Sequence, residues 1–428
     1  MRTLLLTLIL TVLPVAAQSK SYVLKAARLF DGNRISSPGL VVVTGSKILE
    51  VGAGSPIPTG AEVIDFGDAT LSPGFIDAHT HLSMPDHGNF QKMLIDGLQQ
   101  TIPEQTLMAL ENLRKTLHAG FTTVRDVGSH DFLDVGLRNG VRKGKIEGPR
   151  MLVAVHALGS TGGHCDDQAG FRPGLFGRET GPEDGVINSP EQARYAVRYN
   201  VKYGADVIKT CATGGVLSLT DEIDTPQLTQ EELNALVDEA HALRKKTAAH
   251  AHGANGAKRA IRAGIDSIEH GTFLDDEALE MMKQRGTVLV PTLMALEGGR
   301  AMIAAGSQPP AIEAKMRLAI ETMSKTFKNA ISKGVIIGLG TDAAVYPHGR
   351  NAGEFNQMVQ LGMEPIAALR AGTSVDSRLL GIDKYAGTIE AGKMADIVVI
   401  PGDPEKEIRN TEKVSFVMKE GVVYRRDR

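Results

Sequence analysis

The chain has 428 residues, enough for one large α/β domain with a smaller one, or for two to three ordinary domains. Hydrophobic residues make up 42% and charged residues 23%, as in a soluble globular protein. A net charge of −3 without a basic tract argues against nucleic acid as a partner. The 4% of aromatic residues, with no Trp, argues weakly against stacking surfaces for bases or sugars.

The first residues have the pattern of a secretory signal. Arg2 precedes an apolar run that is short for a membrane span, and the run ends in the small residues of 15–17. We expect residues 1–19 to be a signal peptide and the protein to be exported to a periplasm or secreted. Stable membrane insertion is not expected after its removal, and an N-terminal membrane anchor is the alternative.

The two ends of the mature chain share one pattern. Residues 21–52 and the tail from 387 alternate apolar and polar side chains between Gly, Asn and Pro turn signals, which predicts short antiparallel strands. The simplest arrangement is one small β-sandwich formed by residues 20–72 and 387–428.

Residues 73–386 alternate strand-like and helix-like segments. Helix starts are predicted at Pro103, at Ser189 and at a capping box of Thr229 and Glu232. In the first of these helices, Leu107, Leu110 and Leu117 are expected on one buried face. The strand-like segments are 71–81, 121–128, 150–159, 205–215, 247–253, 266–271, 287–293 and 335–343.

Eight strand–helix units predict a (β/α)8 TIM barrel with its helices outside. A doubly wound open sheet is the alternative, although no Gly-rich phosphate loop follows the first strand. The two cysteines, Cys165 and Cys211, fall within the predicted barrel. An exported chain can pair them, but their spacing does not decide whether they do.

Metal-binding side chains follow the predicted strands at their C-terminal ends, where a barrel of this kind has its active site. They are His79, His81, Lys209, His250, His252, His270 and Asp342. Imidazole and carboxylate are good ligands for a borderline metal. Because side chains two residues apart on a strand point the same way, His79 and His81 can bind one cation. Two solvated histidines are the alternative.

Lys209 ends the apolar strand "DVIK". Burial of an ammonium is costly and lowers its pKa, so the neutral amine becomes available as a nucleophile. A neutral amine can take up carbon dioxide, and the resulting carbamate has two oxygens that can bridge two metal ions. A lysine that extends its charged end to solvent is the alternative.

Six stretches span residues from about 70 to 400: "PGFIDAHTH", "GADVIKTCATGG", "AAHAHG", "AGIDSIEHG", "GLGTDA" and "GTIEAGKMADIVVI". Together they resemble the amidohydrolase superfamily, within it the branch of Xaa-Pro dipeptidases and imidazolonepropionases, and also ochratoxin-type amidases.

The resemblance implies a binuclear centre of two divalent metal ions, expected to be Zn²⁺. His79 and His81 would hold one ion, carbamylated Lys209 would bridge, and His250 and His270 would hold the other. Asp342 would be both a ligand and the proton shuttle. The resemblance favours His250 over His252 as the ligand, and the reverse assignment stays open. It also implies a homo-oligomer.

The same pattern predicts the reaction. Two ions hold a bridging hydroxide that attacks an amide carbonyl, and Asp342 passes the proton to the leaving nitrogen. The backbone N–H groups of Gly215 and Val216, together with Arg350, are expected to meet a substrate carboxylate. His164, His252 and also His156 are further candidates for substrate contacts, with packed or solvated histidines as the alternative.

The expected substrate is a small molecule with a free carboxylate. It is a dipeptide of the Xaa-Pro or Xaa-Arg/Lys kind or an N-acyl amino acid, including one with a bulky acyl group as in ochratoxin. A cyclic-amide hydrolase of the imidazolonepropionase or dihydropyrimidinase type is the alternative enzyme. A non-catalytic barrel is a further alternative. It would lack one or more of the metal ligands, and no ligand is missing from this sequence.

Overall fold

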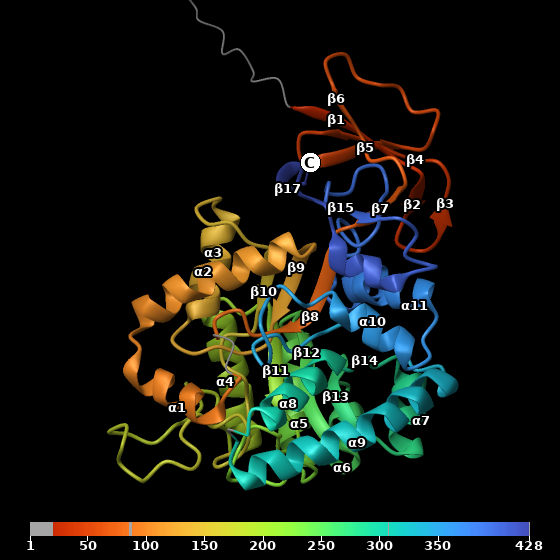
Figure 1. The fold of residues 1–428 in the computed structure, drawn as a ribbon. Helices are drawn as coiled ribbons and strands as arrows, with labels where there is room; N and C mark the ends of the chain where they lie inside the picture. Colours follow the sequence, from red (N-terminus) through yellow and green to blue (C-terminus); the bar gives the residue numbers. More distant parts are fainter. Residues whose placement is uncertain (1–19, 85–87, 307, 428) are drawn as a thin grey trace, which may run out of the picture.

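The computed structural model describes residues 20–84, 88–306 and 308–427, so the predicted signal peptide lies outside the described residues. A smaller region of strands and a larger α/β region lie side by side (Figure 1). In the smaller region, the red N-terminal strands lie next to the blue C-terminal strands. Among the described residues, no helix is both long and apolar enough to cross a membrane.

The smaller region consists of two sheets. One has the strand order β5-β4-β1-β6 and the other the order β17-β16-β15-β7-β2-β3. The strands are β1 (Ser21–Ala26), β2 (Arg28–Phe30), β3 (Ile35–Ser36), β4 (Gly39–Thr44), β5 (Lys47–Val51), β6 (Glu62–Asp65), β7 (Ala69–Pro73), β15 (Ile397–Pro401), β16 (Phe416–Lys419) and β17 (Val422–Arg426). Because β15 pairs with β7, the two ends of the chain share one sheet.

Two strand pairs in this region differ from the sequence prediction. β1 pairs with β6, and β2 with β7, in parallel rather than antiparallel fashion. A parallel pair needs a long crossover connection, and the chain between β1 and β6 contains β4 and β5. Alternation of side chains predicts strands but does not predict which strands become neighbours.

In its described residues, the larger region contains seven strands with only parallel neighbours. They form two sheets, in the orders β10-β9-β8 and β11-β12-β13-β14. The strands are β8 (Phe75–Thr80), β9 (Phe121–Asp126), β10 (Arg150–Val153), β11 (Val207–Cys211), β12 (Lys246–Gly253), β13 (Ser267–Phe273) and β14 (Val288–Val290). Isolated parallel bridges connect Leu158 with Thr210, Leu289 with Ile337, and Thr80 with Ala343.

The eighth predicted strand, 335–343, is not a regular strand in the structure. It contacts β14 and β8 through the two isolated bridges at Ile337 and Ala343. Gly338 and Gly340 interrupt it, and glycines weaken a strand. A Cβ at Gly340 would lie 2.7 Å from the Cβ of His79, so the close approach of this segment to β8 requires glycine.

The helices begin close to the predicted residues. Ser189 accepts a hydrogen bond from the N–H of Gln192, and Thr229 with Glu232 forms the predicted capping box. The first predicted helix begins at Ile102, one residue before Pro103, and Thr101 is its N-cap. The helices are α1 (Phe90–Gln99), α2 (Ile102–His118), α3 (Leu133–Arg142), α4 (Pro190–Tyr203), α5 (Gln230–Ala242), α6 (Ala254–Ala263), α7 (Asp276–Arg285), α8 (Leu293–Ala304), α9 (Pro310–Lys333), α10 (Gly353–Gln360), α11 (Pro365–Arg370), the π-helix η1 (Ala371–Val375), α12 (Asp376–Leu379) and the 3₁₀-helix η2 (Ile408–Lys413).

The predicted apolar face of α2 is wrong at one residue. Leu107 is 68% exposed, whereas Leu117 is fully buried. The two residues are ten positions apart, which separates them by roughly 80° around an α-helix.

Candidate metal centre

Three of the predicted ligands meet at the end of β8, where the segment 335–343 lies alongside it. The Nε2 atoms of His79 and His81 each lie 3.5 Å from Oδ1 of Asp342. The backbone N–H of Asp342 donates to the carbonyl of His79 at 2.8 Å. His79, Asp342 and His270 form a trio whose ligand atoms all lie within 4.8 Å of one another. This spacing is suited to a shared cation.

A buried ion pair orients His79. Its Nδ1 lies 2.8 Å from Oε2 of Glu269, and the other oxygen of Glu269 accepts from Arg125 at 2.8 Å. Arg125 and Glu269 are both fully buried. Because Nδ1 is engaged, Nε2 is left to act as a ligand. This buried Nε2 has no hydrogen-bond partner among the described residues, which is costly unless a ligand satisfies it.

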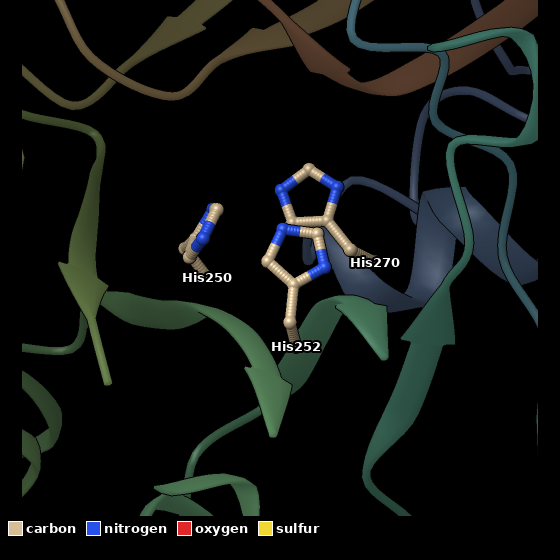
Figure 2. Close-up of side chains that lie close together, drawn as sticks. All are labelled: His250, His252 and His270. Atoms are coloured by element: carbon tan, nitrogen blue, oxygen red, sulfur yellow. The ribbon is translucent and has the colours of Figure 1, made fainter. Parts of the chain in front are cut away.

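His250, His252 and His270 form a second trio, also with ligand atoms within 4.8 Å of one another. Figure 2 shows the three imidazoles grouped together, two from β12 and one from β13. The rings of His250 and His252 lie 4.5 and 4.8 Å from the ring of His270. The geometry therefore brings both histidines of β12 to His270 and leaves the choice between them open.

Neutral groups orient this second trio. Nδ1 of His252 lies 2.7 Å from the hydroxyl of Thr272, and Nδ1 of His270 lies 2.8 Å from the hydroxyl of Thr292. Nε2 of His250 lies 3.1 Å from the carbonyl oxygen of Gly214. The nitrogens left for a metal are therefore Nε2 of His252 and His270 and Nδ1 of His250.

Lys209 is buried on β11, the strand next to β12. Burial lowers its pKa to about 8, although the charges of Glu269 and Asp342 oppose this shift. No hydrogen bond or ion pair of its amine is found within the described parts of the chain. A lysine in this state is closer to the neutral amine than a solvated lysine is.

Burial also sets the protonation of the histidines. It lowers the pKa of His81 to about 4 and that of His252 to about 3. The pKa values of His79, His250 and His270 lie well below the usual range for the same reason. Neutral imidazole is the form that binds a metal. Burial raises the pKa of Asp342 to about 6, which suits a group that exchanges protons near neutral pH.

Backbone strain is concentrated at the same positions. His270 and Asp342 have φ angles of 68° and 56°, in the left-handed region that favours glycine. Such conformations cost about 1–3 kcal/mol each and cluster at functional sites. Thr292, the hydroxyl partner of His270, has a φ of 52°. The surrounding contacts therefore maintain an unfavourable backbone at the points where ligands are presented.

Of the predicted substrate contacts, His252 belongs to the second trio, and His164 packs against that trio. Its ring centroid is 4.3 Å from that of His250. Gly215 packs against it, since a Cβ there would approach the ring to 2.3 Å. The neighbouring Cys165 forms a disulfide with Cys211 of β11, a pairing that the sequence had left open. The loop after β10 is thereby covalently tied to the strand that carries Lys209.

Three other candidates lie away from these contacts. Val216 is partly buried in an apolar cluster with Phe90, and His156 packs against Phe132. Arg350 is exposed and lines a separate cavity whose lining includes neither histidine trio. The described contacts therefore do not bring the guanidinium of Arg350 to the predicted ligands.

Sequence reasoning missed the residues that hold the ligands in place. Asp77 is fully buried and accepts from the Thr341 hydroxyl at 2.6 Å, the Asn351 amide at 2.8 Å and the His79 N–H at 3.1 Å. Asp77 and Glu269 each stand in an otherwise apolar strand within two residues of a candidate ligand. A charge in such a place is the sequence signal for a positioning group.

Residues 70–424 match the Amidohydrolase family. The chain belongs to this family. It is 30% identical to ochratoxinase of Aspergillus niger over 378 residues, which cover 83% of this chain and 75% of that protein. Of the solved structures, a Xaa-Pro dipeptidase with bound methionine has 37% identity and a TM-score of 0.88, covering 95% of this chain and 100% of its own.

A prolidase complexed with N-methylphosphonate-L-proline has 31% identity and a TM-score of 0.85, with the same two coverages of 95% and 100%. The structural neighbours imply the amidohydrolase architecture for this chain, a TIM barrel with an attached β domain. Amidohydrolases are typically metal-dependent hydrolases, and the two histidine-containing trios fit such a group.

Proposed function

We propose that this amidohydrolase is a binuclear zinc enzyme that cleaves the amide bond of dipeptides or N-acyl amino acids, with Xaa-Pro dipeptides as the first candidates. The observation that carries the proposal is the pair of trios that share His270, together with the buried Nε2 of His79, which has no hydrogen-bond partner in the described structure. The eight parallel segments would form a closed barrel, residues 73–386, with the β-sandwich made by 20–72 and 387–428.

The ligands would divide between two ions. His79 and His81 would hold one and His250 and His270 the other, with Lys209 as a carbamate between them. The lowered pKa of Lys209 supports the last assignment, because only the neutral amine adds carbon dioxide. His252 would then face the substrate, although its place in the second trio makes it the alternative ligand.

When bound, the two ions would supply an activated water and polarise the carbonyl of the scissile amide. The side chain of Asp342 lies between His79 and His81 and has its pKa raised to about 6. It would accept the proton of the attacking water and deliver it to the leaving nitrogen. An amine is a poor leaving group, so the second transfer is as important as the first.

The residues next to the second trio suggest which part of the substrate would bind there. His164 would contact a free carboxylate or the group next to it, whereas the N–H of Gly215 already donates to the Asp221 carboxylate at 3.3 Å. The relatives support this class, since their names refer to Xaa-Pro dipeptides, a proline phosphonate and ochratoxin. The greater identity to the dipeptidase, 37%, supports dipeptides before N-acyl amino acids as the substrates to test first.

Elemental analysis of the mature protein, paired with a substrate panel, tests the proposal. Two zinc equivalents with release of proline from Xaa-Pro dipeptides, or of the free amino acid from Xaa-Arg or N-acyl compounds, are the expected result. One equivalent would remove the bridging role of Lys209. Turnover of hydantoins or imidazolones alone would replace the proposal with a cyclic-amide hydrolase, and no metal with no turnover would indicate a non-catalytic barrel.

Two variants test the assigned roles. Lys209→Ala is expected to lose one metal equivalent and most of the activity, whereas Asp342→Asn is expected to lower kcat by about 10²–10⁴-fold. Full metal-dependent activity in either variant would contradict the mechanism.

We also propose that the protein is exported and forms a homo-oligomer. N-terminal sequencing of the protein from its native compartment is expected to begin near residue 20. Light scattering after size-exclusion chromatography is expected to give a multiple of the monomer mass, and a clean monomer would end that part of the proposal.

A further inference from the structure

A second concave site lies apart from the histidine trios. It is a cavity of about 790 Å³ with walls from α2, α8, α10, η2 and β17. None of the proposed metal ligands lines it. Five lysine and arginine side chains line it, as do two carboxylates: Lys115, Arg350, Arg409, Lys413, Arg425, Glu297 and Glu412. Positive charge is therefore in excess on its surface.

Neighbouring carboxylates outside the cavity neutralise only part of this charge. Lys115 pairs with Glu111 at 2.9 Å, and Arg425 pairs with Asp427 at 2.7 Å. Glu297 is itself occupied by Arg300. These three wall residues contribute little net charge for a ligand, because each already has an opposite charge beside it.

The other three cations remain without a carboxylate. Among the described residues, Arg350 and Lys413 form no ion pair, and the side chain of Arg409 donates only through Nε, to the amide oxygen of Asn356 at 3.3 Å. The backbone N–H of Arg409 donates to the carboxylate of Glu407 at 3.2 Å. The guanidinium nitrogens of Arg409 beyond Nε are thus left for a further acceptor. Glu412 is the one wall carboxylate in the described structure without an ion pair. The uncompensated charge of the walls is therefore two positive units.

We propose that this cavity is a second ligand site and binds a small oxyanion with two or more negative charges. Two arginines with free guanidinium nitrogens suit an oxyanion, which can accept two parallel hydrogen bonds from each. A concave surface of one sign concentrates counter-charge. Its volume falls in the range of about 300–1,000 Å³ that is typical of small-molecule sites. Phosphate and polycarboxylates share this chemistry, and the proposal does not depend on the amide substrate.

Isothermal titration calorimetry of the metal-loaded protein at low salt tests the proposal, with inorganic phosphate in one arm and citrate in the other. Saturable binding of at least one of them is expected. The double variant Arg409→Gln/Lys413→Gln should weaken it at least tenfold. Lys283→Gln on α7, an exposed lysine outside the cavity, is the matched control and should bind as the wild type does.

The double variant distinguishes anion binding in the cavity from anion binding elsewhere on the protein. Phosphate that binds only through the metal ions would keep its affinity in the double variant, and this result would overturn the proposal. Absence of binding by both anions would do the same. If the double variant fails to fold, as judged by circular dichroism, Arg350→Gln replaces it with the same expected loss. A variant that changes the oligomer mass without any anion effect would instead make the cavity a subunit interface.

Discussion

The two groups of candidate ligands are held in place by different chemistry. We call His79, His81 and Asp342 the β8 half, and His250, His252 and His270 the β12–β13 half. In the β8 half, the ring of His79 contacts the buried pair of Glu269 and Arg125. In the β12–β13 half, two threonine hydroxyls and one backbone carbonyl engage the rings.

The difference shows how a protein can make one part of a site more rigid than another. A buried ion pair fixes both position and charge, because removal of either partner leaves an unpaired charge in the interior. A threonine hydroxyl is neutral and adapts to either tautomer of an imidazole. We therefore expect damage to the β8 half to affect folding and metal binding together, and damage to the β12–β13 half to affect mainly the metal.

Glu269→Gln should have the largest effect of the variants that test the difference between the two halves. It leaves the fully buried guanidinium of Arg125 without its carboxylate, which is expected to cost about 3–5 kcal/mol of unfolding free energy. Zinc affinity should fall about 10–100-fold, because His79 loses its orienting partner. Urea unfolding of the metal-free protein and a competition titration with a chelator measure the two effects. Unchanged stability would mean that Arg125 finds another acceptor.

Loss of the disulfide should have the second-largest effect. Cys165→Ser/Cys211→Ser opens a loop with a sequence separation of 46, and the unfolded chain gains entropy worth about 4 kcal/mol. Because Cys165 adjoins His164, KM should change more than kcat. Reduced wild-type protein serves as the control and should match the double variant in urea unfolding. A variant as stable as the oxidised wild type would contradict the tie between the loop and β11.

The pH dependence of stability should differ in sign between His252 of the β12–β13 half and Asp342 of the β8 half. Burial lowers the pKa of His252 to about 3, so the unfolded chain alone takes up its proton below pH 6.5. The stability that this histidine contributes is present above pH 6.5 and is lost as the pH falls towards 3, by about 1.4 kcal/mol per pH unit. His252→Gln should remove this slope from the metal-free protein.

The stability contribution of Asp342 should have the opposite pH dependence. Burial raises its pKa to about 6, so the folded chain keeps a proton that the unfolded chain loses above pH 4. Its contribution therefore declines as the pH rises from about 4 to 6, by up to about 1.4 kcal/mol per pH unit. Asp342→Asn should make the metal-free protein less sensitive to a rise in pH, and unfolding at a series of pH values compares both variants. Slopes of the same sign would contradict the assignment.

Thr292→Val should have the smallest effect. It removes the hydroxyl that lies 2.8 Å from Nδ1 of His270 and keeps the shape of the side chain, at a cost of about 1 kcal/mol. Folding should be nearly normal and zinc affinity moderately lower. Thr326→Val, which removes another buried hydroxyl, is the control for stability alone. A loss as large as that of Glu269→Gln would remove the difference between the halves.

The sequence was sufficient for the order of strands and helices in the α/β region. Apolar segments end at Gly, Asn or a polar residue, and helix caps such as Thr229 are local signals. It was insufficient for the segment 335–343, because the close approach of Gly340 to His79 depends on residues far apart in the chain. The prediction for Leu107 fails for a different reason, because the ten positions between Leu107 and Leu117 place the two side chains on different sides of the helix.

The candidate site also contains some residues that the sequence predicts and others that it does not. Residue type and spacing predicted the histidines, Lys209 and Asp342, and the structure brings several of them together. The contacts of Glu269 with His79 and with Arg125 join residues 190 and 144 positions apart, so no local pattern contains them. Period-two spacing also places His250 and His252 on one side, and for that reason it cannot choose between them.

The bridge between Thr80 and Ala343 has a consequence for biosynthesis. A ribosome makes His79 and His81 early, but Asp342 follows only after almost the entire α/β region has been synthesised. The β8 half therefore cannot exist on a growing chain, even though two of its three ligands have already emerged. Metal capture at this half should be one of the last steps in maturation, and a chain interrupted before residue 342 would leave two histidines without the carboxylate that completes their site.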